Sequence, residues 1–300
     1  MNNFFIGMHG KYDFDKFNRD FKKEFYGLEI CLFKEKDIKH LIEESKKNNF
    51  KYGIHFPLRK DDNHLRDSSF LSLSENERLE SYKRVEDELK YIKNNKLNPQ
   101  YILFHFPKPA IIHKDFDLTR WRFSDRSEYV YENEYPFEKF KQYSQELFKW
   151  ISVKSRQYNF VPVLELDALN KYMLNDNFID NLLETYDSVK LCLDIGRLHI
   201  QNMINDNFNA YSLVKRLAKY TFLVHLWNAK AGDMKYYHYP PLKDLKKEDG
   251  FADIEMYLKL IKRENSNFKI LFEHKSEVIS DEELEECYEY IKTIVKEVNV

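Results

Sequence analysis

Four short apolar runs of this chain end in an acidic or imidazole side chain. The runs are VPVLE, KLCLD, TFLVH and KILFE, and their last residues are Glu165, Asp194, His225 and Glu273. Runs of this composition are typical of buried strands, and a parallel barrel gathers the carboxyl ends of its strands on one face. We therefore expect the four side chains to converge. Carboxylates and an imidazole, without a thiolate, suit a divalent metal such as Mn²⁺, Mg²⁺, Co²⁺ or Zn²⁺.

A metal ion at this position would leave two of its ligands able to do proton chemistry. An open coordination position could accept a hydroxyl and a carbonyl oxygen of a substrate. Glu165 and Glu273, on opposite sides of that substrate, could remove a carbon-bound proton and return it through a metal-stabilised enediolate. This is the chemistry of aldose–ketose isomerisation and of epimerisation. The alternative is a set of separate strand-end ion pairs with Lys230, Lys275 and Arg197.

Two further histidines occur in a repeated motif. His55 and His105 lie in IHFP and FHFP, at the ends of two other apolar runs. At equivalent barrel positions they could provide a second metal subsite that shares Glu165 with the first. Two alternatives remain open: the two histidines, His105 in particular, bind the substrate, or both are hydrogen-bonded imidazoles of the core.

Several other residues near strand ends are candidates for substrate binding. His9 ends the first apolar run, and Arg197, in LDIGRLHI, could pair with a carboxylate or a substrate phosphate. Trp227 could stack on the apolar face of a sugar, and Lys230 could hold its oxygens. His238, within YYHYP, could reach over the site or could be a half-exposed loop residue packed on tyrosines.

These residues need a scaffold that brings strand ends together, and the rest of the sequence predicts one. Eight apolar runs alternate with amphipathic segments, an order that predicts an α/β fold, the (β/α)8 TIM barrel. An open doubly wound sheet is disfavoured, because the sequence has neither a G-x-G-x-x-G turn nor a Walker motif. The predicted strands are 4–9, 27–33, 52–56, 101–106, 161–166, 189–195, 221–227 and 268–274.

Helical segments and long connections complete the predicted barrel. Helices are expected over 13–25, 37–49, 74–95, 136–159 and 281–298. Two connections, 107–136 and 228–253, are long and leave strand ends, as lids and binding loops do. No linker or repeat divides the chain, so we expect one domain over residues 1–300.

Composition limits the partners and the compartment. A formal net charge of −2 gives no general attraction for nucleic acid, and no apolar run approaches the roughly 18 residues of a membrane span. The N-terminal sequence lacks the features of a signal peptide, and three scattered cysteines fit a reducing compartment. We expect a cytoplasmic protein that binds a small molecule, with a homodimer as the commonest assembly for such proteins.

With Glu165, Asp194, His225 and Glu273 in this order, the chain resembles the xylose isomerase-like TIM-barrel superfamily. That superfamily includes sugar-phosphate isomerases and epimerases and the endonuclease IV family of apurinic-site endonucleases. The resemblance runs from GMHG to LFEH. It implies a Glu–Asp–His–Glu metal set in which the two glutamates act as acid and base.

The endonuclease IV branch implies additional zinc ligands. Its enzymes hold three zinc ions, and its added histidines match His55, His105 and His238. Two other positions depart from that branch: Arg197 stands where it has a metal-binding His, and Tyr236 stands where it has Asp. The resemblance to this branch therefore covers part of its zinc set.

Three functions are compatible with these patterns. The leading hypothesis is a metal-dependent isomerase or epimerase of a sugar or sugar phosphate. The second is a zinc-dependent phosphoester hydrolase of the endonuclease IV type, with His55, His105 and Glu165 as its first zinc subsite. The third is a non-catalytic barrel that binds a small molecule or a partner protein.

Overall fold

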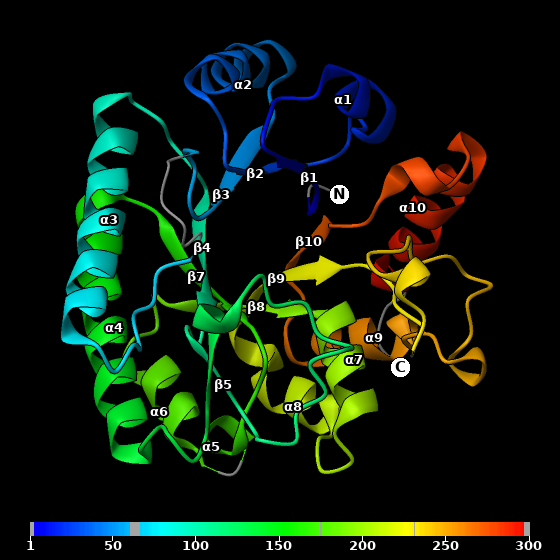
Figure 1. The fold of residues 1–300 in the computed structure, drawn as a ribbon. Coiled ribbons are helices and arrows are strands. Elements are labelled where there is room, and N and C mark those ends of the chain that lie inside the picture. Colours follow the sequence, from blue (N-terminus) through cyan, green and yellow to red (C-terminus); the bar gives the residue numbers. More distant parts are fainter. Residues whose placement is uncertain (1–2, 61–66, 175, 231, 297–300) are drawn as a thin grey trace.

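The apolar runs form the strands of a closed barrel in the computed structural model, which describes residues 3–60, 67–174, 176–230 and 232–296. The barrel strands are β1 (Phe4–His9), β2 (Gly27–Cys31), β3 (Lys51–His55), β4 (Tyr101–Phe106), β7 (Val161–Leu166), β8 (Lys190–Asp194), β9 (Thr221–Leu226) and β10 (Lys269–Phe272). They pair in parallel in the order β1-β10-β9-β8-β7-β4-β3-β2, and the ring closes (Figure 1). The predicted (β/α)8 fold is confirmed.

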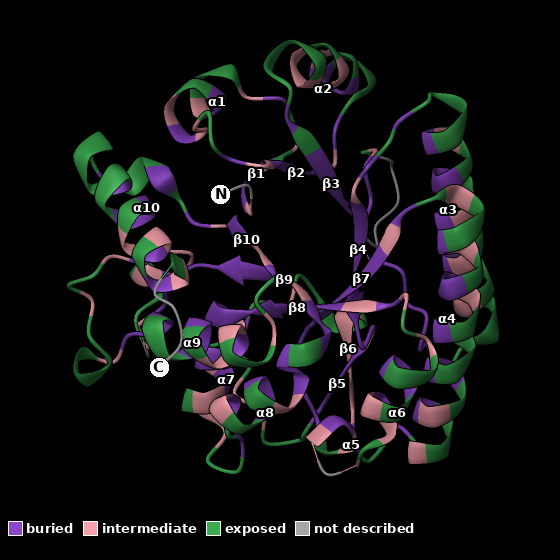
Figure 2. Ribbon diagram, turned by 180° about the vertical axis from the view of Figure 1, so that it is seen from behind, coloured by how far each residue is buried: buried purple, intermediate pink, exposed green. Residues whose placement is uncertain are grey.

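Helices surround the strands on the outside of the barrel. They are α1 (Phe14–Asp20), α2 (Glu35–Asn48), α3 (Glu75–Asn94), α4 (Phe137–Tyr158), α5 (Lys171–Leu174), α6 (Phe178–Thr185), α7 (Ile195–Ile204), α8 (Ala210–Leu217), α9 (Ile254–Glu264) and α10 (Asp281–Lys296). The first helix ends earlier than predicted, at Asp20, where the chain turns extended at Phe21. The strands are almost entirely buried, while the helices expose their outer faces (Figure 2).

The alternation of side chains along each strand separates two cores. On β7, Val163 points into the barrel and Leu164 points towards the helices. The interior core consists of Phe5, Tyr101, Leu103, Val163, Cys192, Leu223 and Leu271. Because the side-chain period of a strand is two residues, the next inward position towards the carboxyl end belongs to Glu165 on β7 and to Asp194 on β8. The interior core is therefore the floor of the site.

One tyrosine closes that floor. Tyr101 is fully buried inside the barrel, and its hydroxyl donates a hydrogen bond of 2.8 Å to Glu29. A Cβ atom at Gly53, on β3, would lie 2.1 Å from Cζ of Tyr101. Glycine at this position is therefore what makes room for the ring.

Two long connections leave the barrel where the sequence predicts them. The one after β4 contains β5 (Ala110–Ile112), η1 (Arg126–Glu128) and β6 (Tyr129–Tyr131), and β5 and β6 form a small parallel sheet that the sequence does not predict. The one after β9 contains η3 (Met234–Tyr236) and η4 (Lys247–Asp249). Among the residues that the structure describes, no helix has the length and apolar character that a membrane crossing needs.

Candidate metal centre

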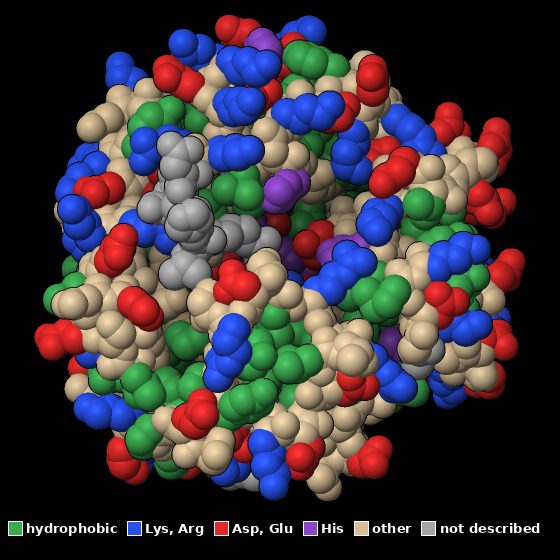
Figure 3. Space-filling view, in the orientation of Figure 1, with side chains coloured by type: hydrophobic (Ala, Val, Ile, Leu, Met, Phe, Trp, Pro, Cys, Tyr) green, Lys and Arg blue, Asp and Glu red, His purple; other side chains and the backbone are tan. Residues whose placement is uncertain are grey.

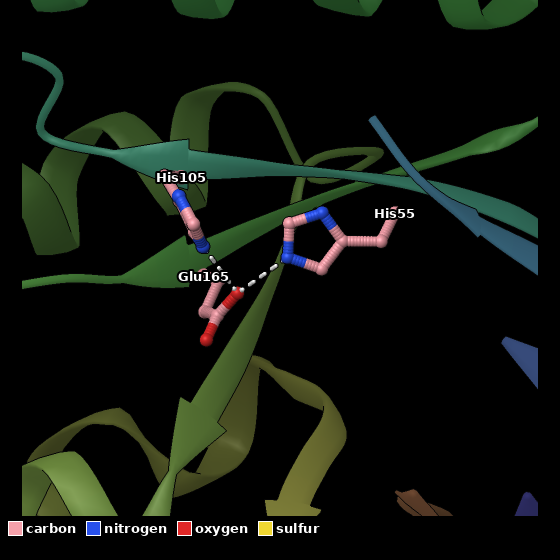
Figure 4. Close-up of side chains that lie close together, drawn as sticks. All are labelled: His55, His105 and Glu165. Atoms are coloured by element: carbon pink, nitrogen blue, oxygen red, sulfur yellow. Dashed lines mark ion pairs between the residues drawn. The ribbon is translucent and has the colours of Figure 1, made fainter. Parts of the chain in front are cut away.

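Two histidines and a glutamate meet at the carboxyl ends of β3, β4 and β7. Oε2 of Glu165 lies 3.0 Å from Nε2 of His105 and 3.3 Å from Nε2 of His55. Both imidazoles point towards the carboxylate (Figure 4). One potential ligand atom from each residue lies within 4.8 Å of the other two. We name this group the imidazole-rich subsite.

The other oxygen of the same glutamate belongs to a second group. Oε1 of Glu165 lies 3.3 Å from Nδ1 of His225, and Oε2 of Glu273 lies 3.2 Å from that nitrogen. Asp194 is the register partner of His225 on the neighbouring strand, and these two residues and Glu165 have ligand atoms within 4.8 Å of one another. We name Glu165, Asp194, His225 and Glu273 the carboxylate-rich subsite. The structure thus brings together all four residues that the sequence selects first.

Unpaired polar atoms mark the carboxylate-rich subsite. Oδ2 of Asp194, Nδ1 of His225 and Oε2 of Glu273 are buried and have no hydrogen-bond partner within the described chain, and the same holds for Oε2 of Glu165. Buried polar atoms without a partner each cost on the order of 1–3 kcal/mol. Three of these atoms belong to the carboxylate-rich subsite, while Oε2 of Glu165 faces the imidazole-rich subsite. Because oxygen and imidazole nitrogen atoms of this kind bind cations, the side chains of both subsites fit a divalent metal ion.

The electrostatics of the carboxylate-rich subsite favour a cation as well. Burial, helped by the negative charge of Glu273, raises the pKa of Asp194 to about 7, although Arg197 acts in the opposite direction. Burial also opposes ionisation of Glu273, but His225 outweighs it and lowers the pKa of that carboxyl to about 2. Carboxylates that repel one another in this way gain stability from a positive ion between them.

Two hydrogen bonds fix the tautomers of the imidazole-rich subsite. Nδ1 of His55 faces the carbonyl oxygen of Phe56 at 3.1 Å, and Nδ1 of His105 faces Oδ2 of Asp67 at 2.8 Å. Oxygens of this kind accept, so both Nδ1 atoms donate and both Nε2 atoms are directed towards Glu165. In the metal-free chain burial disfavours the charged form of His55, but Cys31 and Glu165 outweigh it and raise the pKa of its imidazole to about 9, so a metal ion would take the place of the proton on Nε2. The two Nδ1 hydrogen bonds are the outer-shell arrangement of histidines that bind metals.

His225 is held in the same way, through its opposite nitrogen. Nε2 of His225 faces Oε2 of Glu29 at 3.3 Å, which leaves Nδ1 for the carboxylate-rich subsite. Glu29 in turn accepts a hydrogen bond from the hydroxyl of Tyr101. Glu29 is not among the residues predicted from the sequence, although a signal for it exists: an acidic residue interrupts the apolar run GLEIC. No such signal exists for Asp67, which lies in the connection after β3.

Arg197 pairs with carboxylates of the protein, one of the two roles that the sequence leaves open for it. Its Nη1 donates to Asp167 at 2.8 Å, and its Nε lies 3.3 Å from Oδ2 of Asp194. Asp194 also accepts the backbone N–H of Arg197 at 3.0 Å and so caps α7, which begins directly after β8. The cap orients the carboxylate of Asp194.

A cavity of about 370 Å³ opens beside the carboxylate-rich subsite. Its lining includes His9, Glu29, His55, His238 and Glu273. The space-filling view shows the corresponding hollow at the centre of the barrel face, with histidine and acidic side chains inside it and many Lys and Arg side chains around it (Figure 3). A cavity of this volume lies in the range that small-molecule sites occupy.

Comparison with known proteins supports the architecture. No protein-family model matches the sequence, and no curated protein matches it. Solved structures do match: a D-tagatose 3-epimerase-like protein has a TM-score of 0.63 at 14% identity, over 98% of this chain and 97% of its own. The 3-keto-D-glucoside 4-epimerase YcjR from E. coli has a TM-score of 0.61 at 12% identity, over 98% of this chain and 100% of its own. The IolI protein, solved with a bound zinc atom, has a TM-score of 0.54 at 13% identity, over 98% of both chains.

The fold is that of the xylose isomerase-like TIM barrels. The resemblance stated from the strand-end residues is thereby confirmed at the level of fold. At these identities the likeness does not assign a substrate to this barrel.

The xylose isomerase-like barrel does not bring every predicted substrate-binding residue to its cavity. Trp227 is fully buried: a Cβ atom at Gly196 would lie 2.2 Å from its ring, and His238 stacks on it with ring centres 4.1 Å apart. Trp227 therefore supports His238, which reaches the cavity and lies 2.7 Å from the carbonyl oxygen of Glu273 through Nδ1. Lys230 lines a separate cavity of about 200 Å³ beside Tyr237.

Proposed function

We propose that this xylose isomerase-like barrel is a divalent-metal-dependent isomerase or epimerase that acts on a sugar or sugar phosphate. One observation carries the proposal: Glu165 and Glu273 approach Nδ1 of His225 at 3.3 and 3.2 Å, beside the cavity and among unpaired buried polar atoms. Two proteins with the same fold are a D-tagatose 3-epimerase-like protein and a 3-keto-D-glucoside 4-epimerase, whose names describe reactions at sugar carbons.

Glu165 and Glu273 are the pair that would exchange the proton. Both are ionised near neutral pH, the form that accepts a proton: burial works against ionisation, but His225 lowers the pKa of Glu165 well below its ordinary value and that of Glu273 to about 2. A divalent ion held by the carboxylate-rich subsite would offset the negative charge that develops on the substrate oxygens. One glutamate removes the carbon-bound proton and becomes protonated, and the other first takes up a proton from water and then delivers it to the substrate, which leaves it ionised.

The two glutamates differ in how far their side chains are exposed to solvent. The side chain of Glu165 is 2% exposed, while that of Glu273 is 31% exposed and lines the cavity. His9 and His238 line the same cavity, where their imidazoles could bind substrate hydroxyls. Glu273 is therefore the better placed of the two to exchange its proton with water between turnovers.

Solvent exchange tests this proposal directly. Purified protein is first analysed for bound metal and then incubated in D2O with a panel of ketoses, aldoses and their phosphates, with Mn²⁺ or Mg²⁺ added. We expect deuterium at the carbon next to the carbonyl of one substrate, detected by NMR. The Glu273→Gln variant should abolish the exchange. Absence of exchange with every sugar tested, in protein that binds the metal, would refute the proposal.

A phosphoester hydrolase is the second candidate, and the imidazole-rich subsite favours it. Two histidines that keep Nε2 towards Glu165 suit Zn²⁺ more than Mg²⁺, and one protein with this fold holds a zinc atom. The reaction catalysed separates the two candidates, since both subsites can take part in either. Cleavage of bis(p-nitrophenyl) phosphate with Zn²⁺ bound favours hydrolysis, and solvent exchange of a sugar proton with Mn²⁺ or Mg²⁺ bound favours isomerisation.

A further inference from the structure

Lys108 is an enclosed cation that the proposed chemistry does not use. It lies two residues after β4 and is 3% exposed. Its Nζ lies 3.0 Å from Glu128, 3.2 Å from Asp67 and 3.2 Å from Asp167. Removing an ammonium group from water costs several kcal/mol unless well-placed partners compensate. Three carboxylates supply that compensation, so Lys108 holds three acidic side chains around one point.

The three carboxylates come from segments that no strand pairing joins. Asp67 lies in the connection after β3, Glu128 lies in η1 of the connection after β4, and Asp167 directly follows β7. A single ammonium group therefore ties three connections together at the face where the metal centre lies. The same three residues would repel one another without it.

Through Asp67, this cluster reaches the imidazole-rich subsite. Oδ2 of Asp67 faces both Nζ of Lys108 at 3.2 Å and Nδ1 of His105 at 2.8 Å. One oxygen thus takes part in both contacts. Asp67 lies outside the barrel strands, and its contact with Lys108 helps to hold this oxygen in place. That oxygen in turn directs Nε2 of His105 towards Glu165.

The carboxylate-rich subsite has a different support. His225 is held by Glu29, and the other partner of Glu29 is the neutral hydroxyl of Tyr101, which the barrel interior buries. Loss of the Lys108 charge would therefore leave the orientation of His225 unchanged.

We propose that Lys108 is a positioning residue for the imidazole-rich subsite: it fixes Asp67, and Asp67 fixes His105. The inference rests on the metal-binding part of the proposed function. Changes in residues that orient a metal ligand typically cost about 10- to 100-fold in metal affinity. We expect the affinity for the ion of the imidazole-rich subsite to fall, and the affinity for the other ion to stay the same.

The test is a zinc titration of the metal-stripped full chain by isothermal titration calorimetry. Wild type should bind two ions, and His105→Ala identifies the step that belongs to the imidazole-rich subsite. Lys108→Met and Asp67→Asn should each weaken that step by about 10- to 100-fold and leave the other unchanged. Glu29→Gln is the matched control, because it should weaken only the other step.

A double-mutant cycle decides whether Lys108 acts through Asp67. In the Asp67→Asn background, Lys108→Met should have little further effect on zinc affinity, since the intermediate contact is already lost. Equal and additive losses would overturn the proposal, as would a Lys108→Met chain that binds both ions like wild type or loses both equally. Should Lys108→Met fail to fold, Asp67→Asn carries the test alone: normal binding of both ions by that variant overturns the proposal.

The result is independent of turnover. A chain that loses one ion as described and exchanges no proton of any sugar supports this inference and refutes the proposed isomerase function. A wild-type chain that binds one ion only, yet turns over a sugar, overturns this inference and leaves the proposed function in place.

Discussion

The two subsites share Glu165 but differ in composition and surroundings. The carboxylate-rich subsite combines three carboxylates with one imidazole and borders the cavity through Glu273. The imidazole-rich subsite combines two imidazoles with the shared carboxylate. Oxygen-rich sites suit Mg²⁺ and Mn²⁺, whereas imidazole-rich sites suit Zn²⁺ and related ions. The barrel thus offers two different environments for a metal ion on either side of one side chain, and the carboxylate-rich subsite contains both glutamates of the proposed proton transfer.

The shared residue should give the largest effect. In Glu165→Gln, both subsites lose a negative ligand and the proposed proton transfer loses a base, so we expect activity to fall about 10⁴-fold. Metal analysis should show both ions weakened. Glu88→Gln is a matched control, because Glu88 is also buried and ion-paired, with Arg59, but lies outside the centre. Loss of only one ion in Glu165→Gln would contradict the sharing.

The Glu273→Gln substitution should affect one subsite and leave the other intact. Glu273→Gln removes one acid–base group and one ligand of the carboxylate-rich subsite, so activity should fall about 10²- to 10⁴-fold. The ion of the imidazole-rich subsite should stay bound, and circular dichroism should show an unchanged fold. Turnover at the wild-type rate would exclude Glu273 from the chemistry.

His55 should have a smaller effect if the barrel is an isomerase. It belongs only to the imidazole-rich subsite, so His55→Ala should weaken one ion and lower isomerase activity by about tenfold or less. The comparison with Glu273→Gln is informative in both directions. If His55→Ala abolishes cleavage of bis(p-nitrophenyl) phosphate while Glu273→Gln retains that cleavage, phosphoester hydrolysis is favoured over isomerisation.

Strand-end residues were accessible to sequence reasoning because a strand has a fixed period. The inward positions Val163 and Glu165 follow from the alternation in VPVLE, and parallel strands of similar length place Asp194 and His225 at the same level. The fold and the carboxylate-rich subsite therefore follow from local patterns. Helix boundaries follow less closely, as the early end of α1 at Asp20 shows.

Contacts made across connections were not accessible in this way. Asp67 and Lys108 meet because the connections after β3 and β4 lie side by side, and no periodicity relates the two residues. Trp227 was expected to stack on the substrate, yet its ring packs against Gly196 and is covered by the ring of His238. Such features depend on tertiary packing, which determines where a loop side chain lies.

The smallest expected effect concerns the stability of the fold. It tests the difference between the residues that hold the two subsites in place. Lys108, a charged support, lies against Asp167, while the neutral Tyr101 supports Glu29. Burial opposes ionisation of Asp167, but Lys108 and then Arg197 outweigh it and lower its pKa from 3.8 to about 2. A carboxyl with a lowered pKa stabilises the fold above the pKa of the unfolded chain and loses that contribution as the pH falls through the folded value.

Asp167→Asn should therefore cost about 2 kcal/mol near neutral pH, since one pKa unit corresponds to about 1.4 kcal/mol. Urea unfolding of metal-free wild type and variant, from about pH 7 down to about pH 2, measures this difference. The gap should stay constant down to about pH 4 and then narrow, because wild type alone loses the contribution. Asp206→Asn, at an exposed position, should show no gap at any pH. If the Asp167→Asn gap does not change with pH, its cost comes from packing or lost hydrogen bonds, and the charge of Lys108 does not stabilise this side of the centre.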